Sequence, residues 1–201
     1  MMLFTFVVGG YSQNNIQTIT DIDGNKYKTS IIGEQEWMVE NLRTTLLNDR
    51  TSIPNLTDNT EWMQASSSAY SWYENDISNK VVNGGLYNWH AVNTGKLCPE
   101  GWHVPTDVEW STMIDYLGGN NVAFEALTIS GFNAIPGGYR YGYFWGTGLF
   151  YEKGVNGYWW TASENTDTHA WSYTVSNETS KIYRSYFEKN DGFSIRCVRN
   201  K

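Results

Sequence analysis

The sequence predicts one strand-rich domain rather than a helical bundle, and three observations support this prediction. The chain has 201 residues, which is enough for a single domain of two packed layers. It contains 10 Trp, 14 Tyr, 8 Phe and 19 Gly, and this composition suits pleated strands joined by tight turns. Short apolar stretches in its second half are separated by Gly, Asn, Asp and Ser, as is typical of antiparallel strands.

The N-terminal stretch MMLFTFVVGGYSQNN is typical of the end of a signal peptide. We therefore expect residues 1–15 to be a signal-peptide remnant, residues 16–201 to form a single domain, and the protein to be exported. A frayed first strand is the alternative, because no positively charged segment precedes the apolar run. No later stretch reaches the roughly 18 apolar residues of a membrane helix, so no transmembrane segment is expected.

The charge balance argues against several kinds of partner. The chain has 14 Lys and Arg against 21 Asp and Glu, which gives a formal net charge of -7. Such a chain repels the phosphates of nucleic acids and anionic lipid surfaces. Nucleic acid is therefore not an expected partner.

Residues 21–42, DIDGNKYKTSIIGEQEWMVENL, alternate in polarity and are interrupted by two glycines, which predicts strand, tight turn, strand. Asp21, Asp23 and Asn25 resemble the start of a calcium loop. Such a loop needs a glutamate at its twelfth position, where this chain has Ile32. The preferred interpretation is a hairpin turn, because Asp-Gly is a strong turn signal.

The stretch from residue 44 to residue 83 is polar and weakly patterned, and predicts long surface loops with one short helix in DNTEWMQA. Loops on a rigid frame often carry variable binding functions. The following segment, GGLYNWHAV, is expected to be a strand that leads into a turn.

The clearest helix signal follows the stretch CPEGWHVPTDVEW, residues 98–110. Thr106 and Glu109 have the spacing of a capping box, in which each residue hydrogen-bonds to the backbone of the other. Two glycines, at positions 118 and 119, are expected to end the helix. The apolar residues of the predicted helix fall on one stripe, at i, i+3, i+4 and i+7: Trp110, Met113, Ile114 and Leu117.

Five segments beyond residue 131 are expected to be short antiparallel strands. They are GFNAIPGGYR, YWWTAS, HAWSYTV, KIYRSYF and GFSIRCVRN. Just after the first of them, Tyr139, Tyr141, Tyr143 and Trp145 alternate along the chain and would share one face of a strand.

The chain has two cysteines, Cys98 and Cys197, and an even number in an exported protein suggests a disulfide. Two buried free thiols are the alternative and would be favoured in the cytosol. His103 has no partner at the spacing of a metal site, so we expect it to be a hydrogen-bonded packing residue. No GxSxG elbow, P-loop or dinucleotide-binding fingerprint occurs, and we expect no catalytic residue, no metal and no cofactor.

Several of these segments together resemble a known family, the Fibrobacter succinogenes major paralogous domain, an exported or cell-surface domain of bacteria. The resemblance runs in order from Asp21 to Asn200. It implies a protein that is secreted or held at the bacterial cell surface. The segments are DIDGNKYKTSIIGEQEWMVENLRT, GGLYNWHAV, CPEGWHVPTDVEW, GFNAIPGGYR, YWWTASE and GFSIRCVRN.

WHVPTDVEW and GFSIRCV are also similar to segments of the formylglycine-generating enzyme superfamily, whose fold is related to C-type lectins. This similarity implies a C-type-lectin-like α+β fold with twisted antiparallel sheets, few helices, long loops and adjacent termini. Formylglycine-generating enzymes use two nearby cysteines late in the chain, but only Cys197 lies there. Sugar-binding C-type lectins typically carry E-P-N or Q-P-D and a later W-N-D, and none of these triplets occurs here.

The leading functional hypothesis is an exported, non-catalytic binding or adhesion module whose ligand is a glycan or a surface protein. For a glycan, the expected binding residues are Tyr141, Tyr143 and Trp145, because aromatic rings cover the apolar face of a sugar. The alternative for these rings is packing in the core or on a sheet. The alternative functions are an oxidase-like enzyme of the formylglycine-generating type, and a structural domain of a surface assembly.

Overall fold

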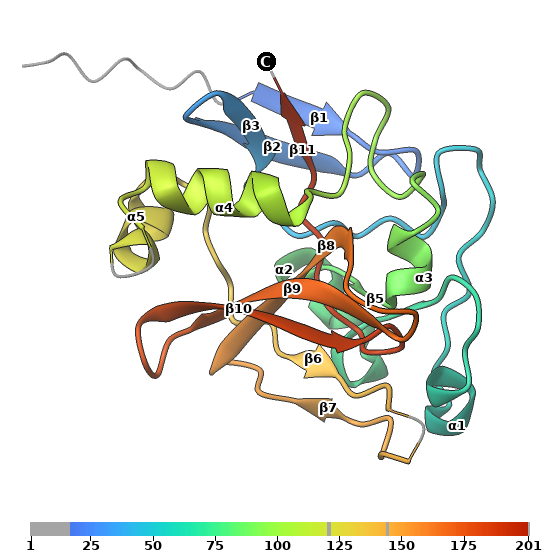
Figure 1. Ribbon diagram of the computed structural model, residues 1–201. Helices are drawn as coiled ribbons and strands as arrows, with labels where there is room; N and C mark the ends of the chain where they lie inside the picture. The colour runs from blue at the N-terminus through green and yellow to red at the C-terminus, as the bar shows by residue number, and fades with distance from the viewer. Residues whose placement is uncertain (1–16, 120–121, 144, 201) are drawn as a thin grey trace, which may run out of the picture.

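A four-stranded sheet, a three-stranded sheet and a small hairpin follow one another across the molecule (Figure 1). In the computed structural model the protein is described over residues 17–119, 122–143 and 145–200. The expected signal-peptide remnant, residues 1–15, lies outside the described residues. The predominance of antiparallel strands, the few helices and the long loops confirm the α+β class.

The four-stranded sheet contains both the first and the last strand of the described chain. Its order is β1-β2-β3-β11, and all neighbours are antiparallel. At the predicted turn the Gly24 N–H donates to the Asp21 carbonyl (3.0 Å), and Gly24 has a φ of 83°. The predicted strand, turn and strand in this region are confirmed. The strands are β1 (Gln17–Thr20), β2 (Lys26–Ile32), β3 (Gln35–Met38) and β11 (Val198–Asn200).

The three-stranded sheet is formed by three of the segments expected to be strands in the second half of the chain. Its order is β10-β9-β8, with both pairs antiparallel. The register between β8 and β9 shifts between Trp160 and Glu164, which is a β-bulge or similar irregularity. The strands are β8 (Asn156–Glu164), β9 (His169–Ser176) and β10 (Lys181–Glu188).

The other two expected strands are regular only at their ends. In GFNAIPGGYR the strand begins late, because Pro136 has no N–H to donate and Gly138 has a φ of 69°. The result is a two-residue strand, β6 (Tyr139–Arg140), paired with β7 (Phe150–Tyr151).

In GFSIRCVRN only β11 is a regular strand, and the residues before it run between the two larger sheets. The Phe193 N–H donates to the Tyr87 carbonyl (3.1 Å), and the Ile195 carbonyl accepts from the Leu42 N–H (2.9 Å). The segment also connects the two larger sheets, because the Ser194 N–H donates to the Tyr158 carbonyl of β8 (3.0 Å) and the Met38 N–H of β3 donates to the Cys197 carbonyl (2.9 Å).

The predicted helix is α4 (Asp107–Tyr116), and its capping box is present. The Thr106 hydroxyl accepts from the Glu109 N–H (3.2 Å), and the Glu109 carboxylate accepts from the Thr106 N–H (2.8 Å). The predicted stripe is buried at Trp110, Met113 and Ile114. α4 lies against both sheets, because Trp110 contacts Trp37 of β3 and stacks on Tyr173 of β9.

A second helix in this region, α5 (Ala123–Ile129), is absent from the sequence predictions. It has seven residues, too few for a helical repeat of apolar positions to stand out in the sequence, and it starts without a side-chain cap hydrogen bond.

Removing the cap of α4 should affect stability alone. Thr106→Ala is expected to lower the free energy of unfolding by about 1 kcal/mol, because the Glu109 N–H loses its acceptor. Chemical denaturation measures this loss, and Ser111→Ala is the control, because Ser111 is half-buried on the same helix and its hydroxyl donates to the Val108 carbonyl instead of capping the helix. A Thr106→Ala protein of normal stability that no longer binds a ligand would contradict the structural role of this stretch.

The stretch from residue 44 to residue 83 is only partly a surface loop. The helix expected in DNTEWMQA is confirmed, but Ile53, Trp62 and Trp72 are buried, so the expectation of surface loops was wrong at these positions. Buried positions can be recognised in a sequence when apolar residues recur at a helix or strand period. These buried residues stand in a segment without such a period, so the sequence does not identify them. The short elements from residue 59 to residue 92 are α1 (Asn59–Met63), β4 (Tyr70–Ser71), η1 (Tyr73–Asn75), η2 (Ile77–Asn79), α2 (Lys80–Asn83), β5 (Leu86–Tyr87) and α3 (Trp89–Val92).

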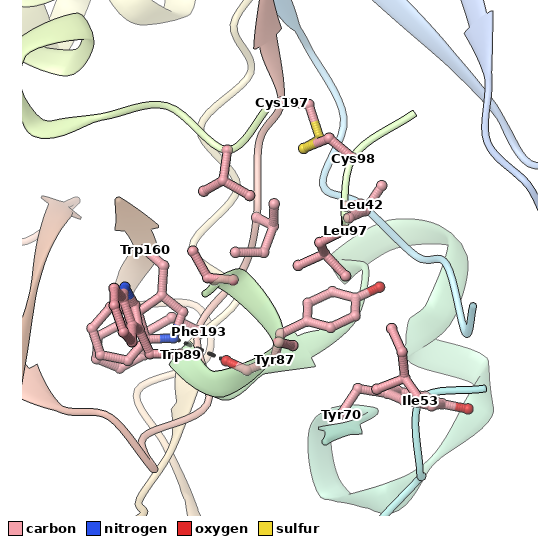
Figure 2. Packing of buried hydrophobic residues seen from close by; sticks show 14 of the residues in the cluster. Leu42, Ile53, Tyr70, Tyr87, Trp89, Leu97, Cys98, Trp160, Phe193 and Cys197 are labelled. Atoms are coloured by element: carbon pink, nitrogen blue, oxygen red, sulfur yellow. Dashed lines mark hydrogen bonds between the residues drawn. A yellow bond between two sulfur atoms is a disulfide. The ribbon is translucent and has the colours of Figure 1, made fainter. Parts of the chain in front are cut away.

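The apolar interior consists of two clusters. One lies around α4 and includes Trp37, Trp110 and Trp159. The other contains Cys98, Cys197 and the aromatic group shown in Figure 2, where the Trp160 indole N–H donates to the Tyr87 carbonyl (2.9 Å). Much of the aromatic content therefore packs in the interior.

Candidate functional site

The stretch that contains Cys98 and His103 is structural. Cys98 and Cys197 form a disulfide across 99 positions, which confirms the predicted bridge (Figure 2). His103 Nε2 lies 2.7 Å from Glu109 Oε1, so His103 is the hydrogen-bonded packing residue that we expected. Burial acts to raise the pKa of Glu109, but hydrogen bonds from Thr106 and His103 hold it below its usual value.

The Asp-x-Asp-Gly turn uses its carboxylates as hydrogen-bond acceptors. Asp21 Oδ1 accepts from the Asn25 N–H, and Asp21 Oδ2 accepts from the Asn25 amide, both at 2.8 Å. Asp23 Oδ2 accepts from the Thr45 hydroxyl (2.9 Å). These contacts fit a hairpin turn. Over the described ranges, no three His, Cys, Asp or Glu side chains are grouped in a way that could hold a metal ion.

A shallow, open depression lies beside this turn. The depression has two charged residues, Asp21 and Glu100. Asp21 is already hydrogen-bonded within the turn, so Glu100 is the charged residue that could contact a ligand. The depression therefore offers few polar groups to orient a ligand. Its lining residues are Thr20, Asp21, Ile22, Asn48, Pro99 and Glu100.

The expected binding residues lie on the hairpin of β6 and β7 and its connection, which we call the aromatic loop (residues 139–143 and 145–151). The expectation that they alternate on one strand was wrong, because β6 ends at Arg140. The Tyr141 N–H still donates to the Leu149 carbonyl (2.8 Å). The Gly142 N–H donates to Asp191 Oδ1 (2.7 Å) and not to a backbone carbonyl of the opposite strand. The backbone pairing of the hairpin therefore stops at this residue.

The three predicted rings differ in exposure. Tyr141 is half-buried, and its ring lies so close to Gly146 that a Cβ on that glycine would be 2.1 Å from it. The Tyr141 ring also meets the Tyr143 ring, with centroids 6.4 Å apart. Tyr143 and Trp145 are exposed over 41% and 81% of their surfaces. The loop therefore presents two accessible rings, and Tyr141 supports that of Tyr143.

Arg140 anchors the base of the aromatic loop. Its side chain is fully buried, and its guanidinium packs over the Trp62 and Phe150 rings, at 4.5 and 4.9 Å from their centroids. Arg140 Nε donates to the Gly148 carbonyl (3.0 Å) within the loop. Its terminal nitrogens donate to the loop that precedes α1, at the carbonyls of Leu56, Thr57 and Asp58 and at Asn59 Oδ1. Burial lowers the pKa of Arg140 to about 10, so the group remains charged at neutral pH.

Asp191 holds the aromatic loop from the other side. Only 4% of the residue is exposed, and the backbone of residues 190 and 191 lies against Gly142. A Cβ on Gly142 would lie 2.0 Å from the Asn190 carbonyl carbon, so only glycine fits there. Burial, reinforced by the charge of Glu188, raises the pKa of Asp191 to about 7.

Acidic groups act on two tyrosines of the aromatic loop. Burial raises the pKa of Tyr139 to about 12, with further contributions from Glu152 and Asp191. Burial also raises the pKa of Tyr141, and the charges of Asp191 and Glu188 act in the same direction. Tyr139 and Tyr141 therefore lie close enough to acidic groups to be affected by their charges.

The structure brings Tyr141 and Tyr143 together and places Trp145 on the same loop, but it adds residues that sequence reasoning missed. Asp191 belongs to an Asn-Asp-Gly turn, and such turns are ordinarily exposed, so nothing in the sequence indicates its burial. Tyr151 of β7 was missed as well, although its ring lies 6.3 Å from that of Tyr141. Its pairing with β6 follows from the hairpin and not from any motif.

The family model described as the Fibrobacter succinogenes major domain matches residues 31–199. Neither a curated protein nor a solved structure matches the chain. The matched residues include β3, α4, the whole three-stranded sheet and both cysteines, together with the end of β2 and most of β11. Because the match covers most of the chain, the protein belongs to the Fibrobacter succinogenes major domain family.

Proposed function

We propose that this protein is an exported, non-catalytic binding module that recognises carbohydrate through Tyr143 and Trp145, with Tyr141 supporting the Tyr143 ring. The observation that carries the proposal is the exposure of Trp145, 81%, on a loop whose backbone is fixed at Arg140 and Gly142. An exposed ring on a fixed backbone loses little conformational freedom when a sugar stacks on it.

The tryptophan distribution supports this assignment. All ten tryptophans lie in the described part of the chain; eight are buried and Trp171 is half-buried. Trp145 is the exposed one. Tyr143 and Leu149 of the same loop are exposed as well, and a group of exposed apolar side chains often marks a binding surface.

The disulfide supports export and a role without thiol chemistry. Both cysteines of the chain are used in the bridge, so neither is a free thiol. Disulfides persist mainly in oxidising compartments, which fits secretion or a cell-surface location. An enzyme of the formylglycine-generating type would need free thiols, so we favour the binding module. No described helix has the length and apolar character needed to cross a bilayer.

The proposal predicts that Trp145→Ala weakens glycan binding by about 1 to 3 kcal/mol and leaves the melting temperature nearly unchanged. A glycan array identifies the ligand, and calorimetric titration measures the affinity of wild type and variant. EDTA should have no effect, because stacking on rings requires no metal.

Tyr143→Ala provides a second test with a closely matched control. Tyr143 and Tyr183 are exposed to nearly the same extent, 41% and 42%, but Tyr183 lies on β10. Binding should weaken in Tyr143→Ala and stay normal in Tyr183→Ala. Equal affinities for the two variants, binding abolished by EDTA, or unfolding of Trp145→Ala would each contradict the proposed mode.

A further inference from the structure

We propose that two copies of this protein associate edge to edge through strand β10, as an antiparallel pair related by a two-fold axis at Ser185. This association does not require glycan binding. Three features of β10 support it: one side of its backbone is unpaired, exposed rings lie along that edge, and the strand is complementary to a second copy of itself.

β10 is a long outer strand whose backbone is paired on one side. All eight of its residues pair with β9, without a register shift. From Lys181 to Phe187, no described backbone hydrogen bond joins the other side of the strand to another segment. The backbone groups on that side are therefore available to a further strand.

The other outer strands of the two larger sheets are shorter or partly covered. β1 has four residues and β11 has three. β8 forms bridges to Gly138 and Ser194, and β11 forms a bridge to His103. Among these strands, β10 is therefore the one best able to accept a partner strand.

β10 lacks the features that usually prevent edge pairing. It contains no proline and no bulge. An outward-pointing charge would also protect the edge, but the Arg184 guanidinium is held within its own chain. Its Nε donates to Asp107 Oδ1 (2.6 Å), and it lies over the Trp171 ring, 3.3 Å from the centroid. Tyr183 and Tyr186, by contrast, are 42% and 55% exposed.

The charges on β10 favour an antiparallel pair of identical strands. Lys181 and Arg184 lie in its first half, and Glu188 ends it. Two antiparallel copies bring the basic half of each strand alongside the acidic end of the other, whereas two parallel copies would bring like charges together. Like charges that lie directly opposite each other destabilise a strand pair.

The register follows from two-fold symmetry. A two-fold axis perpendicular to the sheet keeps each side chain on its own face, so the numbers of opposite residues differ by an even amount. An axis at Arg184 would place two guanidinium groups opposite each other. An axis at Ser185 pairs residues 182–188 of the two copies and places a small side chain at the axis. An axis farther from the middle of the strand would shorten the overlap.

The exposed side chains have suitable partners in this register. Tyr186 of one copy lies opposite Arg184 of the other, which allows a cation–π contact. On the other face, Tyr183 lies opposite Phe187, a half-buried residue whose ring meets Tyr158 with centroids 5.9 Å apart. Cross-strand pairs of aromatic residues stabilise a sheet.

Sedimentation equilibrium of the purified protein tests this association. An interface of one strand pair is small, so the wild type should shift from monomer to dimer as its concentration rises. Ser185→Lys places two ammonium groups at the axis and should raise the dimer dissociation constant about tenfold or more. Thr18→Lys is the control and should keep the wild-type value, because Thr18 is exposed on β1, an outer strand of the other sheet.

Crosslinking tests the register and does not depend on the folding of Ser185→Lys. Cys98 and Cys197 are bonded to each other, so a cysteine introduced on β10 is the one free thiol. A short bismaleimide should join two Ser185→Cys chains. It should not join two Tyr183→Cys chains, because their thiols would lie four positions, about 13 Å, apart along the strands.

Four results would overturn the proposal. One is a wild type that stays monomeric at its highest soluble concentration. Another is an equal dissociation constant for the wild type and a Ser185→Lys protein that melts at the wild-type temperature. A dimer weakened by Thr18→Lys instead would place the interface at β1. Equal crosslinking of the two cysteine variants would contradict the axis at Ser185, whether or not Ser185→Lys folds.

Discussion

Replacing Cys98 and Cys197 together by alanine is expected to lower the free energy of unfolding by about 3 to 5 kcal/mol. The bridge spans 99 positions, so it removes much of the conformational freedom of the unfolded chain. It also joins the start of the loop before α4 to the segment that runs into β11, within a buried cluster (Figure 2).

Denaturant unfolding with and without reductant measures this effect. Reductant should destabilise the wild type and leave the double-alanine variant unchanged, which separates the loss of the bridge from general effects of the reagent. A wild type that unfolds at the same denaturant concentration in both conditions, or peptide mapping that finds two free thiols in oxidised protein, would contradict the role of the bridge.

Arg140→Met is expected to lower the free energy of unfolding by about 2 to 4 kcal/mol, because several buried acceptors lose their donor at once. Arg140 donates to the Gly148 carbonyl and to acceptors in the loop before α1. Methionine fills a similar volume but donates no hydrogen bond. The aromatic loop and the loop before α1 would lose their shared attachment, so glycan binding should weaken as well.

Arg184→Met is the matched control for this variant. Arg184 is exposed and pairs with Asp107 at 2.6 Å, and a surface pair of this kind contributes at most about 1 kcal/mol. Chemical denaturation of both variants gives the comparison. Equal stability of Arg140→Met and wild type would show that the buried guanidinium is not needed to join the two loops.

The features that were predictable from the sequence depend on residues close together in the chain. The capping box needs Thr106 and Glu109, three positions apart, and the first hairpin needs an Asp-Gly pair. The order of motifs also identified the family, because each motif is a short run of neighbouring residues. The disulfide was predictable only together with export, since the same two cysteines would stay reduced in the cytosol.

The candidate site was only partly predictable. The aromatic letters around Tyr141 were visible, but their arrangement depends on Asp191, which is 49 positions from the Gly142 amide it binds. The alternation of aromatic residues predicted a strand. The strand ends because the Gly142 N–H donates to the Asp191 side chain of a distant turn. From the sequence alone, Arg140 would be expected at the surface. It is fully buried, and it donates to acceptors 81 to 84 positions away in the chain.

Tryptophan quenching tests the central claim, that Trp145 is the surface on which a glycan stacks. Acrylamide should quench Trp145 readily, because it is 81% exposed while most tryptophans are buried. Saturation with the tightest-binding array glycan should reduce quenching in the wild type and leave it unchanged in Trp145→Phe. Undiminished quenching of the wild type, with glycan binding confirmed in the same sample by calorimetry, would contradict the assignment of this loop as the binding site.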